Sequence, residues 1–423
     1  MKDGEVLYNS KVDSIYIPIY RLGGGTSAKI WFAVELKNFI KNVKNNRVDV
    51  DYKALKIFRD FETHEWFREI EIHNLFKLNG KHSNNINYPN TFFTTEDEYN
   101  IVVYDVCMCS LYDLYENNSV PKESLNSIIQ QMKDSIQFIH ECGYIHTDVK
   151  LENFLICGYT KKQKQFKKFV DEYNFKNLFN CKIRGGMNID TVLSRVDSQL
   201  EQFKNFIYKK MNILEKKKKD DEDDDESDYD DYDTESDMSY ITDEENHLSY
   251  DKFHIKEFDN KEDDSEEKED KNMDFIVDDE YLKNPLVKLA DFGLIKKEKF
   301  IGSAYPRINR PPETILGLVN TYKSDLWALG LSIYELVNGQ TIFKFQHDSI
   351  YGSDLFHIKT FMELFYDNNE HKDLIKLIKK SERKDYFLSK SDTLLFCKTL
   401  NKLDKNYDYC KDLLHIDPEK RHM

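Results

Sequence analysis

The stretch Tyr144-Ile-His-Thr-Asp-Val-Lys-Leu-Glu-Asn-Phe-Leu-Ile156 carries the pattern from which the fold of this chain can be predicted. It places Asp148, Lys150 and Asn153 within six residues and flanks them with apolar residues that can hold the segment against a core. A carboxylate fixed in this way can accept a hydroxyl proton, a lysine can hold a phosphate oxygen, and an asparagine can ligate a metal ion. The stretch therefore predicts a site for phosphoryl transfer.

These residues resemble the catalytic loop of the eukaryotic protein kinases, His-Arg-Asp-x-Lys-x-x-Asn, with Thr147 where most members carry Arg. A His-Thr-Asp version is typical of the SR-protein kinases and the LAMMER kinases, so the resemblance is greatest to that branch. One short motif is also compatible with a chance polar loop. The other motifs of the chain separate these two interpretations.

The composition indicates a soluble chain with more than one folding unit. At 423 residues, 40% of them hydrophobic, the chain is long enough for about two or three units with sizeable cores. It contains no run of about 18 apolar residues, and its polar start does not resemble a secretory signal. Seven Cys without framework spacing fit a reducing compartment. We therefore expect an intracellular, cytoplasmic protein; a viral source, which the Lys-, Asn- and Ile-rich composition suits, would place it in the host cytoplasm or the virion.

The net charge of −16 is unevenly distributed along the chain. Residues 220–280 contain 30 Asp and Glu against 5 Lys, so this segment carries −25 and the rest of the chain +9. The segment has too few apolar residues to offset the entropy cost of ordering it. We expect a mildly basic body with a disordered acidic segment.

Two expected strands, 15–22 and 30–36, are joined by the glycine-rich turn Gly23-Gly-Gly-Thr-Ser-Ala28. By itself this is an ordinary hairpin. In the kinase family, however, an equivalent hairpin covers ATP, and the sequence here matches Leu-Gly-x-Gly-x-x-Ala-x-Ile, with alanine at the third glycine position. The resemblance implies nucleotide contacts from Leu22, Gly23, Gly24, Gly25, Thr26, Ser27, Ala28, Lys29 and Ile30.

The next expected strand, 51–58, contains Lys56, which matches the family's lysine for the α- and β-phosphates. A helix is expected over 63–78, where apolar residues recur at helical spacing, namely Phe67, Ile70, Leu75 and Leu78. Either Glu69 or Glu71 on this helix can be the acid that pairs with the lysine. The pattern favours Glu69 slightly.

A buried strand, 99–106, is expected to lead into a connector, 107–111. The resemblance implies that this connector is the hinge that binds adenine. Tyr104 then occupies the gatekeeper position, and the segment from Asp105 to Cys107 offers its backbone groups to adenine.

The family similarity is interrupted over 158–281, which we interpret as a spacer insert. Its first part is rich in Lys with scattered Phe and Ile and is expected to contain helices, whereas 220–280 is the acidic segment. The SR-protein kinases likewise carry a long spacer between the two halves of their catalytic domain. Residues 12–157 would then form the small lobe and catalytic loop, and 282–423 the large lobe.

The similarity resumes at Leu286-Val-Lys-Leu-Ala-Asp-Phe-Gly-Leu294, in which Asp291 matches the family's metal-binding aspartate. Glu313 lies at the end of the expected activation segment, and Asp325 matches the residue that holds the backbone of the catalytic loop. Arg421 is expected to pair with Glu313. Because the family normally continues with another helix, the end of the given sequence at Met423 leaves two interpretations open, a shortened large lobe or a truncated sequence.

Together these motifs imply an α+β, bilobal protein-kinase-like fold, with a small antiparallel β lobe above a larger helical lobe and ATP between them. In this family template Lys56, held by its acid, positions ATP, while Asn153 and Asp291 hold Mg²⁺. Asp148 orients the substrate hydroxyl, and Lys150 steadies the γ-phosphate and favours Ser/Thr substrates.

The expected partner is a protein substrate, basic or Arg-rich by analogy with the SR-protein kinases. We expect no nucleic acid or membrane partner, and a monomer. Two other classes stay open, a pseudokinase scaffold and a small-molecule kinase. Because Thr147 offers no positive charge to a phosphate and the segment from Asp291 to Glu313 is short, we also expect activity without phosphorylation of the activation segment.

Overall fold

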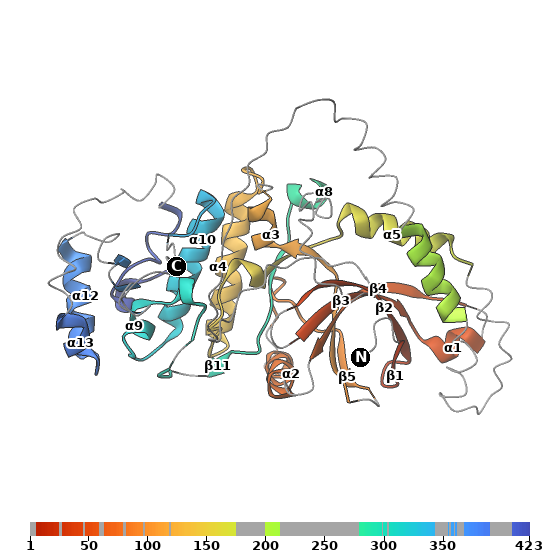
Figure 1. The fold of residues 1–423 in the computed structure, drawn as a ribbon, viewed down its shortest axis with the longest axis horizontal. Coiled ribbons are helices and arrows are strands. Elements are labelled where there is room, and N and C mark those ends of the chain that lie inside the picture. The colour runs from red at the N-terminus through yellow and green to blue at the C-terminus, as the bar shows by residue number, and fades with distance from the viewer. Residues whose placement is uncertain are drawn as a thin grey trace, which may run out of the picture. The chain divides into compact units, whose positions relative to one another are not determined.

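The computed structural model describes residues 6–24, 28–44, 47–58, 63–78, 82–95, 98–117, 120–174, 199–211, 279–297, 299–302, 304–342, 354, 357–358, 360–361, 368–389 and 408–423. The chain divides into two compact units, and Figure 1 labels many of their elements. The first comprises Met1–Tyr52 and Lys162–Ser265, and the second Lys53–Lys161 and Glu266–Met423. Several parts of the predicted features lie outside the described ranges: Gly25 to Ser27 of the turn, Ser303 of the expected activation segment, residues 175–198 and 212–219 of the insert, and nearly all of the acidic segment.

The first unit contains antiparallel strands in the order β1-β2-β3, because β-branched and aromatic residues favour extended backbone. Its elements are β1 (Leu7–Asn9), β2 (Ser14–Gly24), β3 (Ala28–Leu36), α1 (Phe39–Lys44), the start of β4 (Val50–Phe58), α5 (Lys161–Glu172) and a helix over 199–211. In the β2–β3 register Ile17 faces Val34, and the register shifts between Arg21 and Gly23 near the turn. The strands lie within two residues of the predicted bounds.

The described residues in the first part of the expected insert include two helices, α5 and the helix over 199–211, as predicted, and these belong to the first unit. The Phe166 ring of α5 contacts Phe32 edge-on at 5.2 Å and Tyr52 at 6.3 Å between ring centroids. Lys167 Nζ lies 5.0 Å from the centre of the Tyr52 ring, a cation–π contact. Leu200 and Phe203 of the helix over 199–211 are also buried. This part of the insert therefore contributes core side chains to the unit rather than a bare linker.

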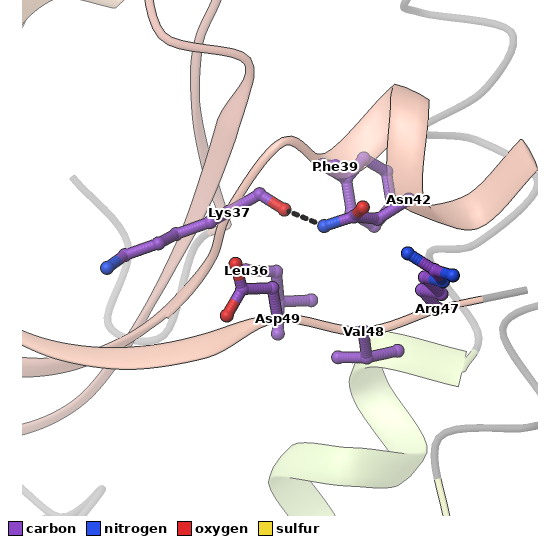
Figure 2. Close-up of a pocket in the computed structure, with 7 residues that line it drawn as sticks. All are labelled: Leu36, Lys37, Phe39, Asn42, Arg47, Val48 and Asp49. Atoms are coloured by element: carbon purple, nitrogen blue, oxygen red, sulfur yellow. Dashed lines mark hydrogen bonds between the residues drawn. The ribbon is translucent and has the colours of Figure 1, made fainter. Parts of the chain in front are cut away.

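A small hollow in the first unit lies beside α1, between the end of β3 and the start of β4 (Figure 2). Its lining consists of Leu36, Lys37, Phe39, Asn42, Arg47, Val48 and Asp49. The Asn42 side-chain amide donates a hydrogen bond to the Lys37 carbonyl at 2.7 Å, as Figure 2 shows. The volume of about 10 Å³ has room for roughly one water molecule, so this hollow is not a nucleotide site.

The second unit combines three groups of strands, ordered β4-β6-β5, β10-β9-β7 and β11-β8, with most of the helices. Its elements after β4 are α2 (Thr63–Leu78), β5 (Thr91–Thr94), β6 (Asn100–Asp105), β7 (Cys107–Ser110), α3 (Leu111–Glu116), α4 (Leu125–Glu141), β8 (Tyr144–Ile145), η1 (Leu151–Asn153), β9 (Phe154–Cys157), α8 (Asp279–Lys283), β10 (Val287–Leu289), β11 (Lys296–Lys297), η2 (Arg307–Asn309), α9 (Pro312–Ile315), α10 (Tyr322–Asn338), α12 (Asn368–Lys380), α13 (Lys384–Ser389) and η5 (Pro418–Lys420). The strands within each of these groups pair antiparallel. The predicted α+β class is confirmed.

Helices α4 and α10 lie side by side and build the main core of the second unit (Figure 1). α4 buries one stripe, which includes Ile128, Met132 and Ile136, as expected for an amphipathic helix. α10 is buried around nearly its whole circumference, begins at a Thr321 capping box and ends at Gly339, whose φ of 70° is left-handed. A central, rigid α10 gives the loops around it a fixed support. None of the described helices is both long and apolar enough to cross a bilayer.

Helix α2 has the predicted bounds, but the prediction of its apolar positions was wrong at Phe67. The Phe67 side chain is 62% exposed, whereas Ile70, His73 and Phe76 are buried. The buried stripe is rotated relative to the expected one, and this rotation places Glu69 inside, where it is only 1% exposed. A buried carboxylate requires an ionic or hydrogen-bonding partner, which the next subsection describes.

Candidate active site

The catalytic loop is held by the Asp325 carboxylate in the first turn of α10. Asp325 is fully buried and accepts hydrogen bonds from the backbone amides of His146 at 2.8 Å and Thr147 at 3.0 Å. The Tyr305 hydroxyl donates to it at 3.0 Å, and His140 Nε2 lies 2.8 Å away. Burial raises the pKa of Asp325, but the contact with His140 outweighs it and lowers that pKa below its usual value. The prediction that Asp325 holds the backbone of the loop is confirmed.

The structure brings together the three polar residues of the loop. The Asn153 amide donates to the Asp148 carboxylate at 2.9 Å and to the Asp148 carbonyl at 2.7 Å. Lys150 Nζ lies 3.2 Å from the same carboxylate, and Asp148 is 8% exposed. The residue before Asp148, Thr147, has a φ of 69°, a backbone conformation that non-glycine residues adopt mainly where surrounding contacts enforce it. The loop therefore presents one carboxylate flanked by an amide and an ammonium group.

A second ionic group is centred on Lys56 of β4. Lys56 Nζ lies 2.7 Å from Glu69 Oε2 and 3.1 Å from Asp291 Oδ1, and the Tyr104 hydroxyl donates to the other Glu69 oxygen. Glu71 is exposed, so Glu69 is the partner of Lys56. Burial disfavours the charge on Lys56, yet the carboxylates outweigh it and raise the Lys56 pKa. The same attraction, against burial, lowers the pKa of Asp291 to about 2, so both groups are ionised at neutral pH.

The pairing of β9 with β10 connects the ionic group around Lys56 with the catalytic loop. The Ala290 amide donates to the Asn153 carbonyl at 2.9 Å, and His146 Nε2 lies 3.3 Å from the Ala290 carbonyl. The Phe292 ring packs on His146 and on His73 of α2, with centroids 5.4 and 5.1 Å apart. These contacts place Asp291 beside the catalytic loop, where it contributes to the charge environment of Lys150.

The Asp291 side chain is the most solvent-exposed of the three in the Lys56 ionic group. Its side chain is 46% exposed, although its backbone is constrained to a φ of 63°. No group of three or more His, Cys, Asp and Glu side chains arranged to hold a metal occurs in the described part of the chain. Mg²⁺ is usually held by one or two carboxylates together with phosphates and waters rather than by an all-protein cage. The oxygen donors of Asp291 and Asn153 fit that mode of binding.

The remaining predicted nucleotide residues divide between the units. In the second unit, Asp105 ends β6 with its carboxylate 2.8 Å from Lys53 Nζ, and Cys107 begins β7. The described hairpin residues lie in β2 and β3 of the first unit. A Cβ added to Gly24 would lie 2.9 Å from the Ala28 carbonyl oxygen, so this turn has no room for a side chain. Nucleotide contacts from Leu22 to Ile30 stay a prediction.

An acidic pair near the loop was missed by the sequence reasoning. Glu335 of α10 is 6% exposed, and burial together with the nearby charge of Glu152 raises the pKa of Glu335 to about 8. Burial also raises the pKa of Glu152. Among the described residues, no Lys or Arg forms an ion pair with Glu335. The sequence feature that could have indicated this buried acid is the single glutamate, Glu335, in the otherwise mostly apolar segment from Ile333 to Leu336.

The end of the activation segment is tied to the end of the chain. Arg421 is fully buried and makes two hydrogen bonds to the Glu313 carboxylate, at 2.7 and 2.8 Å. The guanidinium also lies 5.0 Å from the centre of the Trp327 ring. The predicted pairing of Arg421 with Glu313 is confirmed.

Comparison with known proteins identifies the family. The chain matches the sequence model of the protein kinase domain over residues 16–171 and 271–422. The putative serine/threonine-protein kinase L205 of Acanthamoeba polyphaga mimivirus is 24% identical over 437 residues, covering 89% of this chain and 76% of that protein. Two shorter matches are the dual specificity protein kinase KNS1 of Saccharomyces cerevisiae, 39% identical over 62 residues (14% of this chain, 8% of that protein), and the serine/threonine-protein kinase AFC3 of Arabidopsis thaliana, 37% identical over 70 residues (16% and 17%).

The gap in the family match shows that the domain is split by an insert. The first matched segment extends to residue 171, past the predicted boundary at 157, and so includes nearly all of α5. The matched segments together cover most of the chain. This chain therefore belongs to the protein kinase family, whose members are ATP-binding transferases that act on proteins.

Proposed function

We propose that the chain is an active protein serine/threonine kinase that uses ATP and Mg²⁺, rather than a pseudokinase scaffold. The observation that carries the proposal is the joint placement of Lys56, Glu69 and Asp291 beside Asp148 and Asn153. A scaffold has no need to hold a charged lysine between two carboxylates next to a third carboxylate that is bound by an amide. This arrangement suits in-line transfer, in which positioning and electrostatic stabilisation provide the catalysis.

Each residue has a role that follows from its surroundings. Lys56 keeps its charge because Glu69 and Asp291 flank it, and it would bind phosphate oxygens. Asp148 is held by Asn153 and would accept a hydrogen bond from the substrate hydroxyl and orient it, while Lys150 would neutralise negative charge beside it. Asp291 and Asn153 would hold Mg²⁺, which would neutralise negative charge on the phosphates. For Asp105 and Cys107 we propose that their backbone groups contact adenine.

We further propose that the substrate is basic. Glu335 and Glu152 are close enough for their charges to interact, both are buried or half-buried, and both have raised pKa values. An arginine or lysine side chain of a substrate would supply the missing positive charge. Membership of the SR-protein kinase and LAMMER branch, which Thr147 and the long insert favour, stays part of this proposal.

We propose a later start for the spacer than the sequence predicts. The predicted spacer covers 158–281, but α5 would belong to the catalytic domain, so the spacer would begin after α5. Helix α5 lies in both the family match and the packed first unit. The catalytic domain would then comprise residues 12–171 together with 282–423.

A positional-scanning peptide assay tests the function. Wild-type protein with ATP and Mg²⁺ should phosphorylate Ser or Thr peptides and select Arg or Lys at one position or more. The Asp148→Asn variant should be silent on the same library. Wild-type inactivity on every peptide, despite ATP binding, would favour the scaffold.

The Glu335→Gln variant tests the basic preference. It should lose selection for one basic position and retain turnover of neutral peptides, because Glu335 does not contact the reacting group. Glu71→Gln, on the exposed face of α2, is the matched control and should retain the full preference. Unchanged selection in Glu335→Gln would refute the role of the acidic pair.

A further inference from the structure

Two cysteines face each other on neighbouring strands of the second unit. Strands β7 and β9 pair antiparallel, and their register places Cys107 directly opposite Cys157. Both thiols are reduced and half-buried. Among the five described cysteines this is the only pair matched by strand register.

The backbone geometry of such a pair suits a disulfide. Directly opposed residues of antiparallel strands have Cα atoms about 4.5–5.5 Å apart, within the range of about 4.4–6.8 Å that disulfides require. The register is irregular between Cys107 and Cys109, so β7 bends at this point. A bond between the two sulfurs would need little movement of either strand.

The surroundings of the pair favour one thiol as the nucleophile. A hydrogen bond from the Cys107 thiol lowers the pKa of Cys157, and Lys288 of the neighbouring strand β10 acts in the same direction, against burial and Asp105. The pKa of Cys107 is raised, first by its hydrogen bond to Cys157 and then by burial. Cys157 is therefore the more readily ionised of the two.

We propose that Cys107 and Cys157 form a reversible disulfide that weakens nucleotide binding. The Cys157 thiolate attacks one oxygen of a peroxide, the O–O bond breaks, and Cys157 becomes a sulfenic acid while water leaves. The Cys107 sulfur then attacks the Cys157 sulfur, the S–O bond breaks, and a second water leaves. The two sulfurs together lose two electrons, and the peroxide gains them. Two equivalents of an added thiol reverse the reaction.

The effect on nucleotide binding rests on the proposed function, because Cys107 belongs to the segment assigned to adenine. Cys107 is separated only by Val106 from β6, which carries Tyr104 and Asp105. A disulfide would tie the start of β7 to the end of β9 and prevent the backbone groups proposed to contact adenine from adjusting to the bound nucleotide. The expected result is an increase in the Kd for ATP of about fivefold or more.

The experiment treats the full chain with hydrogen peroxide, alkylates the remaining thiols and maps the disulfides by mass spectrometry. In parallel, the Kd for ATP is measured before oxidation, after it, and after reduction with dithiothreitol. We expect a Cys107–Cys157 linkage, weaker ATP binding, and recovery on reduction. Cys157→Ser should show neither change, whereas the control Cys142→Ser, another half-buried thiol of the same unit, should behave as the wild type.

The outcomes separate this inference from the proposed function. Oxidation that links other thiols, or none, would refute the disulfide; a Cys107–Cys157 linkage with an unchanged Kd would refute the switch. Reduced wild-type protein that fails to bind ATP would refute the proposed function, and the disulfide map would still report the thiol pair on its own.

Discussion

Two aspartates of the second unit, Asp325 and Asp291, make opposite use of a constrained carboxylate. The chain fills the acceptor sites of Asp325 with two backbone amides and a tyrosine hydroxyl, and leaves no part of it exposed. Asp291 has one ionic partner, Lys56, and nearly half of its side chain stays accessible. The comparison teaches two uses of a carboxylate. One whose hydrogen bonds are all made within the protein supports the fold, whereas one that is partly exposed to solvent is available to a ligand.

The energetic reason is the cost of burying charge. An ionised carboxylate is expensive to bury unless hydrogen bonds and opposite charges replace water. Asp325 meets this condition entirely within the protein. Asp291 reduces this cost by its ion pair with Lys56 and by remaining partly accessible. Its left-handed backbone, with a φ of 63°, is a strain of the kind found at functional sites.

The largest expected effect is on stability, and it tests this comparison directly. Asp325→Ala leaves two buried amides and a tyrosine hydroxyl without their acceptor, so we expect the free energy of unfolding to fall by about 3 kcal/mol or more. Asp291→Ala should lower it by less than about 1 kcal/mol, because the group is partly exposed, and should instead weaken Mg²⁺-dependent ATP binding. Urea denaturation and calorimetry measure the two quantities. Equal losses of stability in both variants would contradict the proposed difference between Asp325 and Asp291.

The next effect concerns turnover. Asp148→Asn and Lys56→Met should each lower kcat by at least about a hundredfold while the protein stays folded, since they remove positioning and electrostatic stabilisation. Steady-state kinetics and circular dichroism give the two readouts. Asp134→Asn on the exposed face of α4 is the control and should retain full activity. Near-normal kcat in either site variant would contradict the proposed mechanism.

A smaller, pH-dependent effect comes from Glu335, a carboxylate that is buried but lacks an ionic partner among the described residues. Its pKa rises from 4.5 to about 8, so the folded state binds more protons than the unfolded state between these values. Stability should therefore fall as pH rises from about 4.5 to 8, and Glu335→Gln should flatten this slope in urea titrations.

The same titration should appear in substrate binding. A cationic side chain favours ionised Glu335, so the KM for basic peptides should decrease as pH rises through about 8. Neutral peptides provide the control and should lack this component. A pH profile that is identical for basic and neutral peptides would show that Glu335 does not meet the substrate.

The smallest expected effect is at Ser303, which lies outside the described residues. The activation segment is anchored without phosphate: the Thr147 hydroxyl donates to the Leu294 carbonyl at 2.8 Å, and the Tyr305 amide donates to the Thr147 carbonyl at 3.0 Å. Ser303→Ala, or phosphatase treatment of the wild type, should therefore change kcat by less than about twofold. A large loss in both experiments would show that these neutral contacts are insufficient.

Much of this arrangement could be predicted because it depends on short-range patterns. The bounds of β2, β3, β4 and α2 follow from residue periodicity, which is a property of neighbouring residues. Motif resemblance also predicted two long-range contacts, that of Asp325 with the catalytic loop and that of Arg421 with Glu313. Both involve charged residues embedded in recognisable local motifs.

The sequence by itself determined the fold class and the family, and it supplied the residues that we propose for phosphoryl transfer, because each is encoded in contiguous stretches. Only the tertiary structure decided the choice of Glu69 over Glu71, the packing of Phe166 on Phe32, and the meeting of Glu335 with Glu152. It also decided the pairing of Cys107 with Cys157. The physical reason is that these contacts depend on helix rotation and strand register. A turn of one residue on a helix, or a slip of one residue on a strand, exchanges the buried side chain for an exposed one.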